Sequence, residues 1–375
     1  MKTGKIILFL GAVFIAFCFS ECKKKNKEEE KEEEVAFDKT AMLTNYADNV
    51  ILPKFQAEKT ALDSLALVYT AFTQNKTVTN LQVVRQKFIR AYVKYQHISS
   101  YEFGPSEYVI VRASFDTYPA DTTQINSNIS SGTYDLASAS NIDAKGLPAL
   151  DFLFYGKGRT DADIVTLFDT HTNAANRVTY ASNCIADMQN KLNTVISTWN
   201  SSYRNTFVSS TGSSIGSSLG LLVNQLDFEV DLLKNAKLGI PLGKKSLGTV
   251  LPEKCEAYYV NTISVNLAKE CLNNIEDMYL GRSVSGADGS GLDDYLVALK
   301  AQHNSGTLND AIKAQFAVAK GKLALVPEPL SVQVSTNATT VDAAYLEIQR
   351  LLVLLKTDMP SAMGIVITYQ DGDGD

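Results

Sequence analysis

The sequence predicts an all-α fold in which two helical bundles, each similar to a four-helix bundle, pack together. Three observations support this prediction. Several long segments place apolar residues at every third or fourth position, as the buried face of a helix requires. No segment sustains the alternation of apolar and polar residues that marks a strand. The chain has 375 residues, of which 45% are hydrophobic, and this is enough for two hydrophobic cores.

Five segments carry the helical pattern, and the longest of them runs without a break from Val178 to Trp199. Pro53 precedes the first segment and predicts a kink or a restart of the opening helix, because its ring removes a backbone donor and clashes with the preceding turn. The apolar positions are Leu62, Leu65, Tyr69 and Phe72; Leu81, Val84, Phe88, Tyr92 and Tyr95; Val178, Ala181, Ile185, Met188, Leu192, Val195 and Trp199; Leu219, Leu222, Leu226, Val230 and Leu233; and Tyr345, Ile348, Leu351, Leu352 and Leu355.

Two irregular zones rich in glycine, serine and proline interrupt these helices, at residues 103–146 and 238–252. Each zone follows a pair of helices and precedes a shorter one, so the two halves of the chain have a similar order of elements. A duplicated bundle with irregular crossover loops would explain this order. Unrelated bundles with the same order are the alternative. We expect the N-terminal bundle at residues 38–200 and the C-terminal bundle at 201–375.

The N-terminus has the layout of a secretory signal, which we assign to residues 1–21. Lys2 and Lys5 precede an apolar run from Ile6 to Phe19, and this run is too short to span a bilayer comfortably. Cys22 follows the run and resembles the lipidated cysteine of a bacterial lipoprotein. A plain signal with incidental cysteines is the alternative.

A charged segment follows the predicted lipid anchor. Residues 22–37 contain a block of lysines and then glutamates, which have almost nothing to bury, so they predict a solvated tether. The acidic run also resembles surface-export signals of Bacteroidetes lipoproteins. We therefore expect an outer-membrane lipoprotein of the cell envelope, periplasmic or surface-exposed, whose lipid anchor makes the membrane a partner.

Charge and cysteine usage argue against nucleic-acid binding and against a structural zinc site. The net charge of -6 is spread along the chain without a basic stripe, so nucleic acid is not an expected partner. Once Cys18 leaves with the signal and Cys22 carries lipid, Cys184, Cys255 and Cys271 remain. One disulfide with one buried thiol, or three buried thiols, are both open. Without a CxxC pair or a Cys/His cluster, a structural zinc site is not expected.

Several motifs occur along the chain in an order that is similar to that of imelysin-like proteins, which are classified among metallopeptidases. The resemblance covers nearly the whole mature chain, and it implies an envelope protein of the kind often associated with iron uptake. The motifs are Phe103-Gly104-Pro105, Asp116-Thr117-Tyr118-Pro119, the stretch from Gly146 to Gly156, Gly239-Ile240-Pro241-Leu242-Gly243, and the ending from Ala362 to Asp373.

The family's metal motif reads GxHxxE, and this chain has GxPxxD at Gly146, Pro148 and Asp151. In the family motif, histidine and glutamate three residues apart share one face of a helix and could bind one cation. Pro148 has no side-chain donor or acceptor. We therefore favour a helix start in which Pro148 occupies the first turn and Asp151 complements the helix N-terminus. A functional metal site is the alternative.

Histidines elsewhere do not replace the missing ligand. His97, His171 and His303 are the three histidines of the chain, and none lies beside another or in an HExxH arrangement. A zinc hydrolase normally needs three protein ligands and a water. We accordingly predict no catalytic residues.

The resemblance implies a cleft between the two halves, which polar residues surround. If these residues converge, their oxygen atoms would favour a hard cation or ferric iron over zinc. The alternative is that Asp116 is a turn residue before Pro119, and that Glu256 lies in the first turn of a helix. The candidate ligand-binding residues are Asp116, Tyr118, Gly146, Pro148, Asp151, Glu256 and Ser264.

These observations predict a non-catalytic envelope lipoprotein that holds a small ligand, a cation or an envelope protein in the cleft, with a link to iron uptake. Iron or another divalent cation is the candidate cofactor. An imelysin-type metallopeptidase is the alternative function. A surface component for adhesion or assembly is a third possibility. The acidic C-terminal end from Asp371 resembles the start of a calcium loop but lacks its later ligands.

Overall fold

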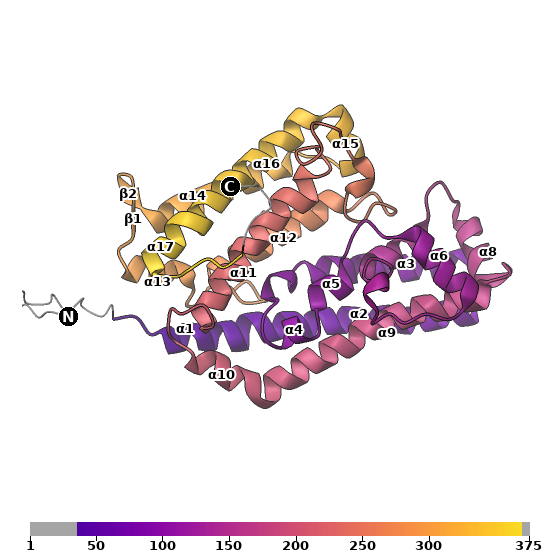
Figure 1. Cartoon of the computed structure of the whole chain (residues 1–375), viewed down its shortest axis with the longest axis horizontal. Coiled ribbons are helices and arrows are strands. Elements are labelled where there is room, and N and C mark those ends of the chain that lie inside the picture. Colours follow the sequence, from indigo (N-terminus) through magenta and orange to yellow (C-terminus); the bar gives the residue numbers. More distant parts are fainter. Residues whose placement is uncertain (1–35, 370–375) are drawn as a thin grey trace, which may run out of the picture. The chain divides into compact units, whose positions relative to one another are not determined.

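Helices make up almost all regular structure in the computed structural model, which describes residues 36–369 (Figure 1). The predicted signal, the lipidation site Cys22, most of the tether and the acidic C-terminal end lie outside the described residues. The predicted all-α class is confirmed. Between residues 36 and 369, strands form one small antiparallel hairpin, in which β1 (Gln302–His303) pairs with β2 (Gly306–Thr307).

The opening helix does not stop and restart at Pro53, because helical structure continues without a gap from Lys39 to Gln74. Helix α1 (Lys39–Asn45) is capped by Asp38, whose Oδ1 accepts a hydrogen bond from the backbone N–H of Ala41. It continues through a π-helical turn, Tyr46–Ile51, into α2 (Leu52–Gln74). Pro53 lies in the first turn of α2, directly after this π-helical turn, and it has no N–H to donate to the turn.

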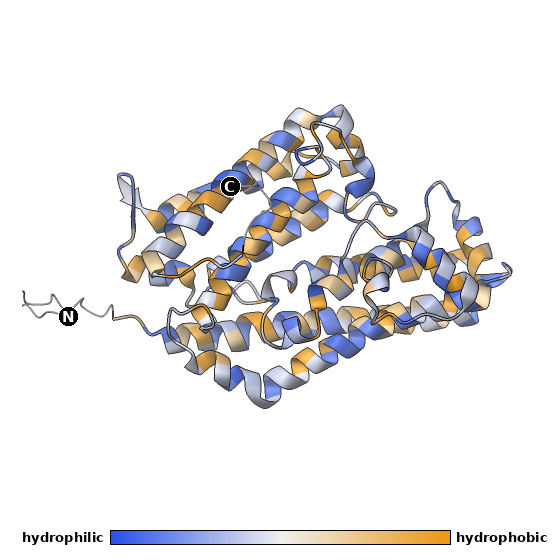
Figure 2. Cartoon of the chain, in the orientation of Figure 1, coloured by the Kyte–Doolittle hydropathy of each residue, from blue (hydrophilic) through white to orange (hydrophobic). Residues whose placement is uncertain are grey.

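In the first half of the chain, α2 packs along both α3 (Val78–Tyr95) and α9 (Ala174–Thr198). The rings of Tyr69, Phe72, Phe88, Phe154 and Phe168 meet in the core of this half. Figure 2 shows hydrophobic and hydrophilic residues alternating along these helices, as amphipathic helices require. The shorter helices of this half are α4 (Pro105–Tyr108), α5 (Val111–Phe115), α6 (Thr122–Ser131), α7 (Gly146–Tyr155) and α8 (Asp161–Asp169).

The zone at residues 103–146 is less irregular than the sequence suggests, because it contains α4, α5 and α6. Helix α6 shows why. One oxygen of Asp121 accepts hydrogen bonds from the backbone N–H groups of Thr123 and Gln124, and Gly132 ends the helix in the left-handed region. These local caps support a helix with little apolar periodicity.

In the second half, α14 packs against α16 and α12, and α16 also contacts α11. Figure 1 shows these helices grouped together. The helices of this half are α10 (Arg204–Ser209), α11 (Ser218–Leu232), α12 (Ser264–Tyr279), α13 (Leu292–Ala298), α14 (Leu308–Ala324), α15 (Leu330–Thr336), α16 (Ala338–Val353) and α17 (Met359–Met363).

Helical structure continues through the position at which we placed the boundary between bundles. Helix α9 runs through the π-helical turn Trp199–Tyr203 directly into α10. Contacts of α12 with α3, and of α11 with the turn Ser99–Tyr101, join the two halves, and the described residues 36–369 group as one compact unit. The division at residue 200 and the duplication stay predictions.

The C-terminal segment does not form the strand that its Ile-Val-Ile-Thr sequence suggests. The side chain of Asn224, on α11, bonds to it as a neighbouring strand would. Asn224 donates to the carbonyl oxygen of Val366 at 3.1 Å and accepts from the backbone N–H of Thr368 at 2.7 Å. One amide side chain therefore satisfies backbone groups that would otherwise need a sheet.

All three cysteines of the described residues are buried free thiols. Of the two arrangements left open by the sequence, the structure has the one without a disulfide. None of the described helices combines the length and the apolar character that crossing a bilayer requires.

Close packing at the start of α7 leads to a first prediction. Gly146 has a φ of +72°, and a Cβ atom there would lie 2.4 Å from the carbonyl oxygen of Phe115 and 2.5 Å from that of Ser114. Gly158 has a similar φ of +67° with open space around it. We expect Gly146→Ala to lower the free energy of unfolding by about 2–3 kcal/mol, and Gly158→Ala by about 1 kcal/mol. Urea unfolding measures both, and equal losses would contradict the packing argument.

Candidate functional site

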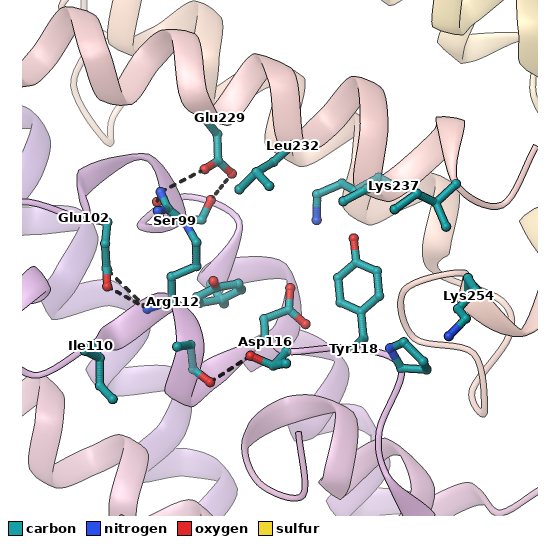
Figure 3. A pocket seen from close by; sticks show the side chains of 16 residues that line it. Ser99, Glu102, Ile110, Arg112, Asp116, Tyr118, Glu229, Leu232, Lys237 and Lys254 are labelled. Atoms are coloured by element: carbon teal, nitrogen blue, oxygen red, sulfur yellow. Dashed lines mark hydrogen bonds and ion pairs between the residues drawn. The ribbon is translucent and has the colours of Figure 1, made fainter. Parts of the chain in front are cut away.

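A large cavity of about 640 Å³ is lined from both halves of the chain (Figure 3). The first half supplies the end of α3, helix α5 and the segment up to Pro119. The second half supplies α11, the π-helical segment Leu233–Gly239 and Lys254. The volume is within the range of pockets that hold small organic ligands.

Asp116 lines this cavity, and Glu256 lies behind the lining, where it is paired with the lining residue Lys237. Tyr92 donates its hydroxyl hydrogen to Asp116 Oδ1 at 2.7 Å. Glu256 is buried and accepts from Lys237 Nζ at 2.6 Å and from Gln96 Nε2 at 2.8 Å. Burial raises the pKa of Asp116 well above its usual range, and the charge of Glu256 raises it further, while Lys237 opposes the shift. Burial and the neighbouring carboxylate thus disfavour the charged form of Asp116.

Lys237 keeps its charge although it is buried. Burial alone would lower the pKa of its ammonium group, but the nearby Glu256, Cys271 and Asp116 outweigh burial and raise it. The result is a buried ion pair between Lys237 and Glu256 that also carries a hydrogen bond. Such a pair fixes the position of both side chains, because separating them would leave a charge alone in the interior.

A second cluster of polar residues is centred on Arg112, at the opposite end of the cavity lining. Its guanidinium donates to the carbonyl oxygen of Ser99 at 2.8 Å and lies 3.4 Å from Glu229 Oε2. Its backbone N–H donates to the carboxylate of Glu102. Burial raises the pKa of Glu102 to about 7, although Arg112 lowers it. One terminal nitrogen of the Arg112 guanidinium is thus held by the protein itself, while its Nε has no hydrogen-bond partner within the described residues.

Among the lining side chains, the ammonium of Lys254 and the hydroxyls of Tyr95 and Tyr118 make no hydrogen bond within residues 36–369. Figure 3 shows the ring of Tyr118 between Asp116 and Lys254, with its hydroxyl toward the open space beside Lys237. Burial raises the pKa of the Tyr118 hydroxyl well above its usual range, so it is a neutral donor.

The GxPxxD stretch forms α7 and borders a smaller adjoining cavity of about 200 Å³, which shares Tyr118 with the large one. Pro148 lies in the first turn of α7, as expected. Asp151 does not complement the N-terminus of its own helix, and that interpretation is wrong. Its position in the second turn directs its two oxygens to the backbone N–H groups of Tyr259 and Val260, each at 2.8 Å.

Asp151 is 1% exposed. Two features of its environment have opposite effects on the pKa of its carboxyl group. Burial raises the pKa to about 7, while the hydrogen bonds from Tyr259 and Val260 lower it. The charged form is therefore less favourable than in water, although two backbone donors face it. The carboxyl group connects α7 to the loop that carries Glu256.

Glu256 lies in this loop and not in the first turn of a helix, so that alternative is also wrong. The next residue, Ala257, has a φ of +53°, which is unusual for a residue with a side chain. Ser264, at the start of α12, donates its hydroxyl hydrogen to the carbonyl oxygen of Glu256 at 2.6 Å. Asp151 and Ser264 thus hold the two sides of a strained loop and position Glu256.

The predicted site residues therefore fall into two sets, those at the large cavity and those that pack behind it. Asp116 and Tyr118 line the large cavity, and Glu256 contacts it through Lys237. Gly146, Pro148, Asp151 and Ser264 lie behind this lining, where they pack or hold the loop. Sequence reasoning missed Lys237, Arg112, Glu229, Gln96 and Lys254. A charged residue within an apolar helical pattern, such as Glu229 beside Val230, is the signal that was available.

The residues at the family's metal position do not fit a divalent cation. Pro148 offers no ligand atom, and both oxygens of Asp151 accept backbone hydrogen bonds. Between residues 36 and 369, no three His, Cys, Asp or Glu side chains gather as a metal site would require. His97 pairs with Glu270 at 3.0 Å, away from the lining of the large cavity.

The fold and the cavity define an all-α protein with a polar site between two helical regions. The chain belongs to the imelysin family, whose model matches residues 51–356. The resemblance of the sequence to imelysin-like proteins is thereby confirmed. A comparison with curated proteins found no significant match.

Two crystal structures share the fold. One is of a candidate iron-regulated protein A precursor from Parabacteroides distasonis, with a TM-score of 0.72 and 16% identity, covering 88% of this chain and 97% of that one. The other is of an imelysin-like protein from Psychrobacter arcticum, with a TM-score of 0.67 and 17% identity and the same coverage of both chains. At these identities the similarity concerns the fold.

Proposed function

We propose that this protein is an exported lipoprotein of the cell envelope that binds a ligand in the large cavity and does not hydrolyse peptides. The observation that supports this proposal is that the candidate acidic ligands already bond to other groups of the protein. Asp151 accepts hydrogen bonds from two backbone amides, and Glu256 accepts them from Lys237 and Gln96. A metallohydrolase needs free ligands for its metal and a free base for its water. A cavity with unpartnered donors, in contrast, suits binding.

The N-terminal pattern and the comparisons support the export and iron parts of the proposal. Signal-like residues followed by Cys22 suit a lipid anchor in the outer membrane. The protein from Parabacteroides distasonis is named as an iron-regulated precursor, which supports a role for this chain in iron supply. Incorporation of labelled palmitate, and its loss in Cys22→Ser, tests the anchor, and protease added to intact cells tests surface exposure.

Ligand binding is tested by filling the cavity. Ala236 lines it and is partly exposed there, whereas Ala314 lies exposed on α14. We expect calorimetry of the wild-type protein to detect binding of ferric citrate, haem or calcium. Ala236→Phe should weaken that binding at least about tenfold, because the added ring occupies ligand space. Ala314→Phe should leave it unchanged. If the wild-type protein binds none of the three, the binding proposal fails.

The family's classification supports the competing function, an imelysin-type metallopeptidase. That function requires stoichiometric metal in protein purified from zinc- and iron-supplemented medium, and chelator-sensitive cleavage of peptides. We expect neither. Detection of both would replace the binding proposal with the enzymatic one.

A further inference from the structure

The charged groups that face the large cavity are almost all paired with one another. Lys237 is paired with Glu256, and Arg112 bonds to Ser99, Gln225 and Glu229. These pairs neutralise the groups involved and leave them few free donors. They shape the cavity, but they are poorly placed to recognise a ligand without breaking an existing contact.

Lys254 and Tyr118 are among the few lining residues whose polar groups make no such contact, so a ligand can bond to them without breaking one. The ammonium of Lys254 makes no ion pair within the described residues, and the hydroxyl of Tyr118 makes no hydrogen bond there. Both lie on the same side of the cavity, with Tyr118 between Asp116 and Lys254 (Figure 3). One cation and one neutral O–H donor that line the same cavity are complementary to an oxyanion.

The neighbouring acid does not repel such an anion. Burial and the proximity of Glu256 raise the pKa of Asp116 and disfavour its charged form, and its Oδ1 already accepts the hydroxyl hydrogen of Tyr92 at 2.7 Å. The negative charge of Glu256 itself is matched by Lys237 at 2.6 Å. On this side of the cavity, the ammonium of Lys254 is thus a positive charge that no carboxylate of the described residues pairs with.

The rest of the lining is apolar enough to take a hydrocarbon part. Ile110, Leu232 and Ile240 line the cavity, and Ile110 is 44% exposed although it is a large apolar side chain. An aliphatic or aromatic group that covered these side chains would remove their surface from water.

Resting on the proposed binding function, we propose that the cavity takes a small organic carboxylate. Its carboxylate group bonds to the ammonium of Lys254 and the hydroxyl of Tyr118, and its apolar part lies against Ile110, Leu232 and Ile240. Two sources share this chemistry: a free organic acid, and the iron complex of such an acid.

Matched ligands and variants test this assignment. The probes are 4-phenylbutyrate and its neutral amide, which have nearly the same shape, together with citrate and ferric citrate. We expect calorimetry to show that 4-phenylbutyrate binds at least about tenfold more tightly than the amide. Lys254→Met should remove this preference, and Tyr118→Phe should reduce it. Lys322→Met, an exposed lysine on α14, should change nothing. Thermal unfolding of all variants confirms that they fold.

The outcomes separate this inference from the function on which it rests. Equal binding of acid and amide, or an unchanged preference in Lys254→Met, overturns the carboxylate assignment, while a loss of binding in Ala236→Phe would still support a ligand cavity. Absence of binding for every probe, including haem and calcium, overturns both. If citrate without iron binds and Lys254→Met weakens that binding, the site takes the free acid. If only ferric citrate binds in this way, the site takes the iron complex.

Discussion

Replacing Lys237 with methionine is expected to lower the free energy of unfolding by about 3–5 kcal/mol at pH 7. The reason is the carboxylate of Glu256, which is 1% exposed and would remain in the interior without its cation. Gln96 would still donate one hydrogen bond to it, but an amide cannot replace a charge. Chemical denaturation followed by circular dichroism measures the change.

A second lysine provides the control for this experiment. Lys244 pairs with Asp342 at the same distance of 2.6 Å, but both side chains are more than a third exposed, at 38% and 36%. Lys244→Met should therefore cost about 1 kcal/mol or less. The double variant Lys237→Met with Glu256→Gln should recover part of the loss, because it removes the unpaired charge. Similar losses in the two lysine variants would contradict a role for burial.

Asp151→Ala is expected to have the next largest effect, about 4 kcal/mol at pH 5. The substitution leaves the backbone N–H groups of Tyr259 and Val260 without their acceptor, and each unsatisfied buried donor costs about 1–3 kcal/mol. Asp121 also serves two backbone N–H groups, but at an exposed helix start. Asp121→Ala should therefore cost only about 1 kcal/mol.

The effect of Asp151→Ala should shrink as the pH rises. Burial raises the pKa of Asp151 from 3.8 to about 7 in the folded protein, so the folded state holds a proton that the unfolded state releases. The stability from this group is fully present below pH 3.8 and is lost as the pH rises through 7. The difference between wild type and variant should fall by up to about 1.4 kcal/mol per pH unit between pH 5 and 7. A difference that grows with pH would contradict this account.

The long helices could be predicted from the sequence because their stability depends on burying one face. The apolar pattern from Val178 to Trp199 corresponds to α9, and Pro53 marks the start of α2. The short helices α4, α5 and α6 were missed because caps and local turns stabilise them, and these leave little periodicity. The contact of the C-terminal segment with the side chain of Asn224 likewise leaves no periodic pattern in the sequence.

The candidate site could be predicted only in part, for a similar reason. Resemblance to a family pointed to Asp116, Tyr118 and Glu256, which do meet around one cavity. The partner of Glu256 is Lys237, on a segment without a regular pattern, and the partners of Asp151 are backbone amides. Backbone donors have no signature in a sequence, so the role of Asp151 in holding a loop required the three-dimensional structure.

The buried thiols give this protein natural reporters of its internal motions. Cys184 lies on α9 in the first half, and Cys271 lies on α12 beside Glu229. Burial raises the pKa of the Cys184 thiol to about 12 and that of Cys271 well above its usual range, so a thiol reagent reacts only when the surrounding structure opens. Comparing labelling rates at the two positions under native conditions then distinguishes independent opening of each half from cooperative opening of the whole.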